Sequence, residues 1–107
     1  MEASEMRVGN FVLNVMNQII TVDWGQIKYA KDFKPIPLSE VWLIKFRFKG
    51  VPHKKGVQAA YKKGSVRINI SNSGNCYYKN KYVYYVHKLQ NLYYELENKE
   101  LTLKENE

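Results

Sequence analysis

The stretch Val66-Arg67-Ile68-Asn69-Ile70 alternates strictly between apolar and polar side chains. Successive side chains of a β-strand point to opposite faces of a sheet, so this alternation predicts a strand with one buried face and one solvent face. The following residues 71–75, Ser-Asn-Ser-Gly-Asn, are typical of a turn. We expect neighbouring strands at 57–61 and 76–79, with turns at 62–64, 71–75 and 79–81, and therefore an antiparallel sheet over residues 57–83.

The hydrophobic period changes after this sheet. Apolar residues recur at the spacing of one helical face, namely Tyr85, Leu89, Leu92, Tyr93 and Leu96. This spacing predicts an amphipathic helix over 84–97 that packs on the sheet. Asn98 tolerates the left-handed conformation that commonly ends a helix. Residues 98–107 are then expected to form a tail that docks through Leu101 and Leu103.

A short helix is predicted upstream, within residues 38–48. Pro35-Ile36-Pro37 ends any preceding strand, because proline cannot donate to a sheet ladder. Ser39 is a favourable N-cap, and Leu38 and Leu43 have the spacing of a hydrophobic staple. Apolar residues surround nearly the whole helix, so we expect burial on more than one side; they are Val41, Trp42, Leu43, Ile44, Phe46 and Phe48.

Residues 1–34 are predicted to form a meander of short antiparallel strands. β-Branched and aromatic residues favour strands at 7–13, 19–24 and 27–30. Such a meander curls into an SH3-like half-barrel. The expected fold class is therefore α+β, with a strand meander, one short buried helix, a sheet and a C-terminal amphipathic helix. A chain of 107 residues is expected to form a single domain.

The composition indicates a globular and basic chain. Hydrophobic residues make up 45% of it, and its formal net charge is +7. Residues 26–94 hold fourteen Lys or Arg against Asp32 and Glu40, a net of +12, whereas residues 1–25 and 95–107 carry −2 and −3. A segment this one-sided repels itself unless an anion lies against it. The acidic C-terminal segment, residues 95–107, is one candidate for this anion. Alternatively, the positive charge serves solubility alone.

Cysteine content and hydropathy bear on disulfide bonding, membrane insertion and cellular location. A single cysteine, Cys76, excludes an intramolecular disulfide framework. The longest uncharged stretch, the fifteen residues Val8–Val22, is too short to span a bilayer and contains several amides. The start of the chain lacks the pattern of a secretory signal peptide. We therefore expect no membrane partner and a cytoplasmic location, in the host cell if a phage encodes the protein.

Three blocks of the sequence resemble one family. Residues 35–40, Pro-Ile-Pro-Leu-Ser-Glu, with Trp42-Leu43 and Lys45-Phe46, resemble the PIPLTEEWLxKFGF block of small proteins encoded by phages and mobile elements of Bacteroidetes. Residues 85–93, Tyr-Val-His-Lys-Leu-Gln-Asn-Leu-Tyr, with Glu100-Leu101, are similar to their YVHxLQNLYxALTGxEL block, and Arg7-Val8-Gly9-Asn10 with Val12 to their RxGNxV opening. The chain departs at Arg47 and Asn98, where the pattern has glycine, and at Val41, where an acidic residue is usual. The resemblance implies an α+β fold and a phage-type genomic setting, and transfers no catalytic residue.

The sequence offers little for catalysis. Paired titratable groups within reach of each other are required, and Asp32 and Glu40 are the only carboxylates between residues 26 and 94. His53 and His87 have no metal ligand at the usual spacing, and His87 is expected to pack or to form hydrogen bonds. A lowered thiol pKa at Cys76 is conceivable but would need a partner such as His87. We expect no enzyme, no catalytic residue, no metal and no cofactor.

Aromatic residues interleave with cations in the middle of the chain, a pattern that favours binding of nucleic acid. Lys and Arg neutralise phosphates, and tyrosine rings stack on bases. The scarcity of arginine, the residue that best reads guanine, indicates weak sequence preference. The candidate nucleic-acid-binding residues are Lys45, Arg47, Lys49, Lys54, Lys55, Tyr61, Lys62, Lys63, Arg67, Tyr77, Tyr78, Lys79 and Lys81.

Two alternatives use the same positive charge. The first hypothesis is a non-catalytic phage-type accessory protein that binds nucleic acid. The second is a module that binds or inhibits an acidic host protein. A third hypothesis is capture of an anionic nucleotide by cations such as Lys62, Arg67 and Lys79, which requires a concave pocket. The sequence leaves the oligomeric state open.

Overall fold

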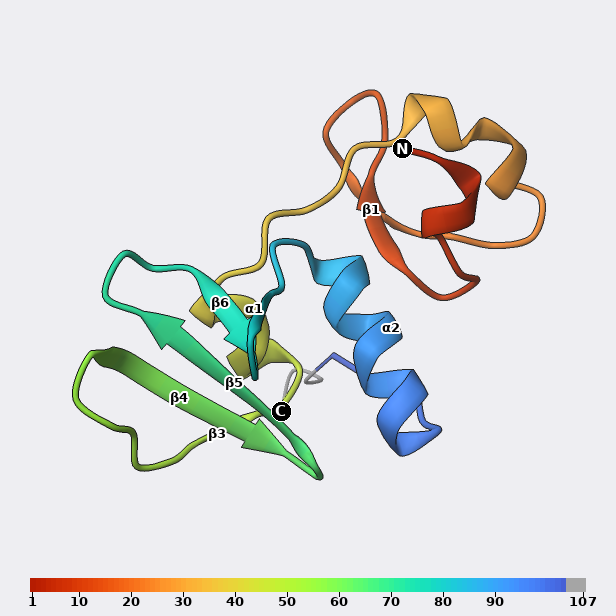
Figure 1. Ribbon diagram of the computed structural model, residues 1–107. Helices are drawn as coiled ribbons and strands as arrows, with labels where there is room; N and C mark the ends of the chain where they lie inside the picture. Colours follow the sequence, from red (N-terminus) through yellow and green to blue (C-terminus); the bar gives the residue numbers. More distant parts are fainter. Residues whose placement is uncertain (104–107) are drawn as a thin grey trace.

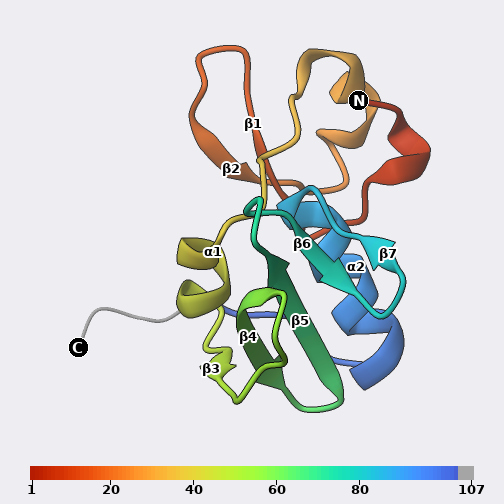
Figure 2. The same cartoon turned by 60° about the vertical axis from the view of Figure 1, so that its left-hand side comes forward.

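The computed structural model describes residues 1–103 and shows an α+β fold with two antiparallel sheets (Figures 1 and 2). The elements follow in the order η1 (Ala3–Glu5), β1 (Phe11–Leu13), β2 (Ile19–Thr21), η2 (Ile27–Asp32), α1 (Glu40–Lys45), β3 (Lys49–Gly50), β4 (Val57–Lys63), β5 (Val66–Ser71), β6 (Cys76–Tyr78), β7 (Lys81–Tyr82) and α2 (Val86–Glu97), where η marks a 3₁₀-helix. None of the helices within this described part of the chain is long and apolar enough to cross a membrane.

The main sheet has the strand order β3-β4-β5-β6-β7, with every neighbouring pair antiparallel. The strand predicted at 66–70 is confirmed, since Val66, Ile68 and Ile70 are buried and the residues between them are half-buried. The strands predicted on both sides of it are confirmed as well. The strand β4 extends to Lys63, so its turn lies at residues 64–65, later than predicted.

One face of this sheet carries the larger core. The helices α1 and α2 bury their apolar side chains against β5 and β6, and Phe11 from β1 packs its ring against those of Trp42 and Phe46 at centroid distances of 6.1 and 6.0 Å. Burial of this apolar surface is the main favourable term in folding. The opposite face of the sheet is left without a helix.

The helix α1 matches its prediction at its start but not in its burial. Ser39 is the N-cap, and Leu38 and Leu43 are both buried, as a hydrophobic staple requires. The expectation of burial on more than one side is wrong, because Val41 and Ile44 are 57% and 48% exposed. Only one side of this short helix meets the sheet. The helix ends at Phe46, after which Arg47 adopts the left-handed conformation with φ +69°.

The helix α2 begins two residues later than predicted; it buries Leu89 and Tyr93 of the predicted apolar face, together with polar residues outside that face. Asn98 ends it in the left-handed conformation, as expected, and donates its backbone N–H to the Tyr94 carbonyl at 2.8 Å. Leu96 of the predicted apolar face is 43% exposed, whereas the polar His87 and Gln90 are almost completely buried. The predicted tail docks through Leu101, but the expected docking through Leu103 is wrong, because this residue is 37% exposed. Residues 104–107 of the tail lie outside the described residues.

The N-terminal lobe, defined as residues 1–34, has a small core of its own. Val12 of β1 and Val22, which follows β2, pack with Met6, Ala30 and Phe33. The third strand predicted at 27–30 is wrong, because this segment forms η2, and the lobe is therefore a hairpin with 3₁₀-helices rather than a strand meander. The Asp23 carboxylate accepts the Gln26 N–H at 3.0 Å, and the Gln26 side chain accepts the Asp23 N–H at 3.1 Å. Such local bonds compete with a sheet ladder and start a tight turn.

A polar network docks this lobe on α2. The Gln90 side chain accepts the Phe11 N–H at 2.8 Å and donates to the Gly9 carbonyl at 3.0 Å. The side-chain Oδ1 of Asn91 accepts from Asn10 Nδ2 at 2.9 Å and from Arg7 Nε at 3.1 Å. Arg7 also pairs with Glu100, whose segment follows α2. Buried polar groups such as Asn10 and Gln90 are stable only when hydrogen-bonded, so this network fixes how the lobe sits.

Candidate functional site

The helix-free face of the main sheet gathers cations in one row. Residues directly opposite each other in an antiparallel pair share a face. Lys49 lies opposite Lys62, and Lys62 lies opposite Arg67, so the three side chains follow one another across β3, β4 and β5. The next row contains Asn69 opposite Tyr77. We call these five residues, Lys49, Lys62, Arg67, Asn69 and Tyr77, the basic face.

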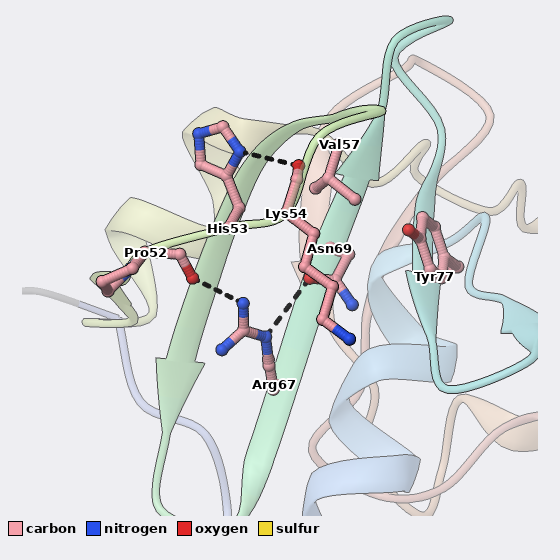
Figure 3. Close-up of a pocket in the computed structure, with 7 residues that line it drawn as sticks. All are labelled: Pro52, His53, Lys54, Val57, Arg67, Asn69 and Tyr77. Carbon is pink, nitrogen blue, oxygen red and sulfur yellow. Dashed lines mark hydrogen bonds between the residues drawn. The ribbon is translucent and has the colours of Figure 1, made fainter.

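A loop over this face forms a cleft. Residues 51–56 leave β3 and fold back towards the sheet, where the Val51 N–H donates to the Ala60 carbonyl at 2.9 Å; in Figure 1 this loop and α2 lie on opposite sides of β4 and β5. Arg67 Nη2 donates to the Pro52 carbonyl at 2.6 Å, and its Nε donates to Asn69 Oδ1 at 3.3 Å (Figure 3). The cleft has a volume of about 510 Å³ and is lined by Pro52, His53, Lys54, Val57, Arg67, Asn69 and Tyr77.

The charge of the basic face is not compensated by neighbouring carboxylates. Within residues 1–103 the ion pairs are Arg7–Glu100 and Lys88–Glu5, and neither involves the basic face or its loop. Lys49, Lys54, Lys55 and Lys62 are exposed, and Arg67 is half-buried. Like charges this close raise the local positive potential, and the cleft concentrates it. A positive potential of this kind favours anions as ligands.

The structure brings part of the predicted site together. Lys49, Lys62, Arg67 and Tyr77 lie on the basic face, and Lys54 and Lys55 lie on its loop. Lys45 and Arg47 lie at the end of α1, away from this face, and the Lys45 ammonium sits 5.1 Å from the centre of the Trp42 ring. These two residues do not join the cationic row.

The remaining predicted residues point towards the helix-covered side of the sheet. Tyr61 lies opposite the buried Ile68, and its pKa is raised by burial and by the neighbouring Glu40. The Lys63 ammonium donates to the Phe46 carbonyl at 2.8 Å, and burial lowers its pKa. Tyr78 and Lys81 share that side, and Lys79 lies over the Tyr78 ring at 5.4 Å. The alternation of strand side chains separates these residues from the basic face.

The candidate residues named from the sequence include Tyr77 but not the rest of a chain of rings at the edge of the sheet. Tyr77 and Tyr82 meet edge to face at a centroid distance of 6.0 Å, and Tyr82 and Tyr84 stack at 5.5 Å with an interplanar angle of 15°. Tyr85 continues the series at 6.4 Å from Tyr84. We call Tyr77, Tyr82, Tyr84 and Tyr85 the tyrosine ladder. The available signal was the alternation Tyr82-Val83-Tyr84, in which Val83 is buried and both tyrosines are more than half exposed.

A second cavity opens beside this ladder. It has a volume of about 260 Å³ and is lined by Tyr78, Lys81, Tyr82, Val83, Tyr84, Tyr85, Lys88 and Leu92. Its wall is mainly aromatic and aliphatic, with two ammonium groups among the lining residues. The cavity is therefore suited to a flat, apolar ring that carries negative charge nearby.

Of the groups weighed for catalysis, Cys76 and His87 are buried, whereas Asp32, Glu40 and His53 are exposed. Cys76 is 3% exposed, and burial together with the nearby Glu40 raises the pKa of its thiol. The lowered thiol pKa considered from the sequence is therefore wrong. His87 is 1% exposed and stacks on Tyr85 at 5.8 Å, while neither ring nitrogen has a hydrogen-bond partner. It packs, as one part of its prediction required, but forms no hydrogen bond. Residues 1–103 contain no group of three or more His, Cys, Asp or Glu placed to hold a metal ion.

Comparisons of the chain with family models, with curated proteins and with solved structures found no match. Function is therefore inferred from the basic face, its cleft and the tyrosine ladder themselves.

Proposed function

We propose that this protein binds nucleic acid through the basic face and acts without catalysis. The observation that carries the proposal is the row Lys49–Lys62–Arg67 on the helix-free face of the sheet, beside the cationic loop 51–56. None of these three cations forms an ion pair within the described residues. A nucleic-acid backbone supplies regularly spaced phosphates, and binding releases the counterions condensed on it. A row of cations at strand spacing offers several such phosphate contacts at once.

The proposal includes low sequence specificity. Direct reading of a base needs a side chain with a fixed pattern of donors, such as the arginine fork. Arg67 is the arginine on the basic face, and two of its three nitrogens already donate to Pro52 and Asn69. Lysines act as mobile point charges and contact phosphates without reading bases.

Capture of a single nucleotide is the second candidate, favoured by the cleft of about 510 Å³ with Lys54, Arg67, Asn69 and Tyr77 in its wall. Lys79, expected to join Lys62 and Arg67 in such a site, is instead held over Tyr78. The two candidates differ in their dependence on length. Nucleotide capture gives the same affinity for a mononucleotide and an oligonucleotide, whereas backbone binding gains affinity with each added phosphate.

The test compares two double variants of equal charge. Lys49→Gln/Lys62→Gln removes two cations of the basic face, and Lys28→Gln/Lys31→Gln removes two cations of η2 in the N-terminal lobe. A labelled 20-nucleotide oligonucleotide is titrated at a series of salt concentrations. The first variant is expected to lower the salt slope of log K by about 1.4, since each lost contact contributes about 0.7 on a single strand.

The control variant separates a local contact from a general effect of net charge. If the face binds phosphates, the Lys28/Lys31 variant keeps nearly the full salt slope. Equal losses in both variants would show that only the net charge matters, and the absence of binding at low salt by the folded protein would refute the proposal.

A further inference from the structure

We infer that the tyrosine ladder stacks the unpaired bases of a single strand, so that the protein selects single-stranded over duplex nucleic acid, an inference that rests on the proposed function. The ladder is open to such a ligand. Tyr82 and Tyr84 are 53% and 54% exposed, and Tyr85 is 38% exposed. Tyr85 is covered on one side by the ring of His87, so Tyr82 and Tyr84 are the most open rings of the ladder, although aromatic side chains gain most when they are buried.

The ladder and the basic face form one continuous surface. Tyr77 belongs to both, because it lines the cleft with Arg67 and meets the ring of Tyr82 on the neighbouring strand. Adjacent strands lie about 4.8 Å apart, so the path from β3 to β7 measures about 19 Å. A short run of nucleotides can therefore place phosphates on the lysine row while its bases reach the rings.

The cavity beside the ladder has the size and chemistry for one base. Its volume of about 260 Å³ lies just below the range of about 300–1,000 Å³ typical of drug-sized ligands. Tyr82 and Tyr84 already stack on each other at 5.5 Å, which leaves no room for a base between them. A base would instead occupy the cavity or an outer ring face. Lys81 is exposed and lines the cavity, so its ammonium can meet an adjoining phosphate, whereas Lys88 is paired with Glu5 at 3.6 Å.

Stacking of this kind distinguishes single strands from duplexes. In a duplex each base face is covered by its neighbours, so a protein reaches only phosphates, sugars and base edges. In a single strand the base faces are available, and stacking on aromatic side chains is tolerant of sequence because every base has a ring face. The basic face then serves both forms, while the ladder adds affinity for single strands alone.

The experiment measures three ligands against three proteins. The ligands are a 20-nucleotide DNA strand of mixed sequence, its duplex, and the RNA strand of the same sequence, each followed by fluorescence anisotropy. The proteins are the wild type, Tyr82→Leu/Tyr84→Leu, and Tyr29→Leu as a matched control, since Tyr29 is 51% exposed but lies in η2 of the N-terminal lobe. Urea unfolding establishes that each variant is folded.

The wild type is expected to bind both single strands more tightly than the duplex at equal salt. The ladder variant should lose about tenfold or more in affinity for each single strand, keep its duplex affinity and keep its salt slope. The Tyr29 variant should change none of these. Ultraviolet cross-linking of the wild type to the DNA strand should attach bases within residues 77–85, a readout that remains valid if the ladder variant fails to fold.

The outcomes separate this inference from the proposed function. Equal affinities for strand and duplex, a loss confined to DNA or to RNA, or cross-links outside the ladder would overturn the inference. The proposed function would survive that result if Lys49→Gln/Lys62→Gln still weakened duplex binding. Absence of binding to all three ligands would refute both.

Discussion

Acidification is expected to destabilise the protein through His87, well before its carboxylates are protonated. The imidazole is buried and has no hydrogen-bond partner on either nitrogen. Burial and the neighbouring Lys88 lower the pKa of His87 from 6.5 to about 4, and the nearby Glu5 only partly opposes this shift. The folded protein therefore holds this histidine neutral.

The sign and size of the effect follow from proton linkage. Between pH 6.5 and 4 the unfolded chain binds a proton at His87 and the folded chain does not, so the free energy of unfolding falls as the pH falls through this window. With a folded pKa of about 4, the loss reaches about 3 kcal/mol by pH 4 and levels off only below that pH. Glu5 and Glu97, whose pKa values are lowered below 4.5, lose their own stabilisation only at lower pH.

Urea unfolding between pH 7 and 4.5 measures this effect. The fluorescence of Trp42, which is 8% exposed, reports the core, and the 81% exposed Trp24 gives a nearly constant background. His87→Leu removes the titration and leaves no hydrogen-bonding partner unpaired, so its stability at pH 7 should stay within about 1 kcal/mol of the wild type. The reasoning fails if the wild type and His87→Leu lose stability equally over this range.

Three further predictions concern single positions. Gln90→Met keeps the length of the side chain but leaves the Phe11 N–H and the Gly9 carbonyl unpaired, and it should cost about 2–4 kcal/mol in urea unfolding; a cost below 1 kcal/mol would contradict the role of the network. Arg47→Gly relieves the left-handed backbone and should stabilise the protein by about 1 kcal/mol without changing oligonucleotide affinity, whereas destabilisation would show that the Arg47 side chain contributes contacts that outweigh the strain. The buried Cys76 thiol should react with a thiol reagent at pH 8 at least about tenfold more slowly in the folded protein than in urea, and equal rates would argue against its burial.

The main sheet could be predicted because its signals are local. One buried face makes every second residue of β5 apolar, and the turn residues that follow fix where the strand ends. The N-cap at Ser39 and the left-handed Asn98 are equally local signals. Each depends on chemistry within a few residues of the position it determines.

The predictions from sequence are wrong where segments distant in the chain determine the local structure or burial. The burial of Gln90 on α2 follows from the N-terminal lobe, because Gln90 takes both of its partners from Gly9 and Phe11. No sequence pattern within the helix predicts a hydrogen-bond partner about eighty residues away. The segment Ile27–Asp32 has strand-forming residues, but the bonds between Asp23 and Gln26 turn the chain into a 3₁₀-helix first.

The sequence predicts which types of residue form the candidate site, but not which of them share one face of the sheet. Alternation correctly separates Tyr77 from Tyr78, but the register against β5 decides which of the two faces the core. Lys49 lies outside every strand predicted from the sequence, so its place opposite Lys62 depends on a two-residue strand that carries no sequence signal. The exposed Tyr84 owes its place to the segment between β7 and α2, which sequence reasoning assigned to the helix.

The docking of the N-terminal lobe has a consequence for the order in which the protein is made. A ribosome releases β1 first, yet the groups that anchor it, Gln90, Asn91 and Glu100, lie 79 to 93 residues further along. Until they emerge, the Asn10 side-chain amide N–H, the Phe11 N–H and the Gly9 carbonyl must rely on water for their hydrogen bonds. Closing so long a loop is slow compared with forming local turns. Attachment of the lobe is therefore a late event during translation, and a nascent chain arrested before residue 90 would expose this hairpin to proteases.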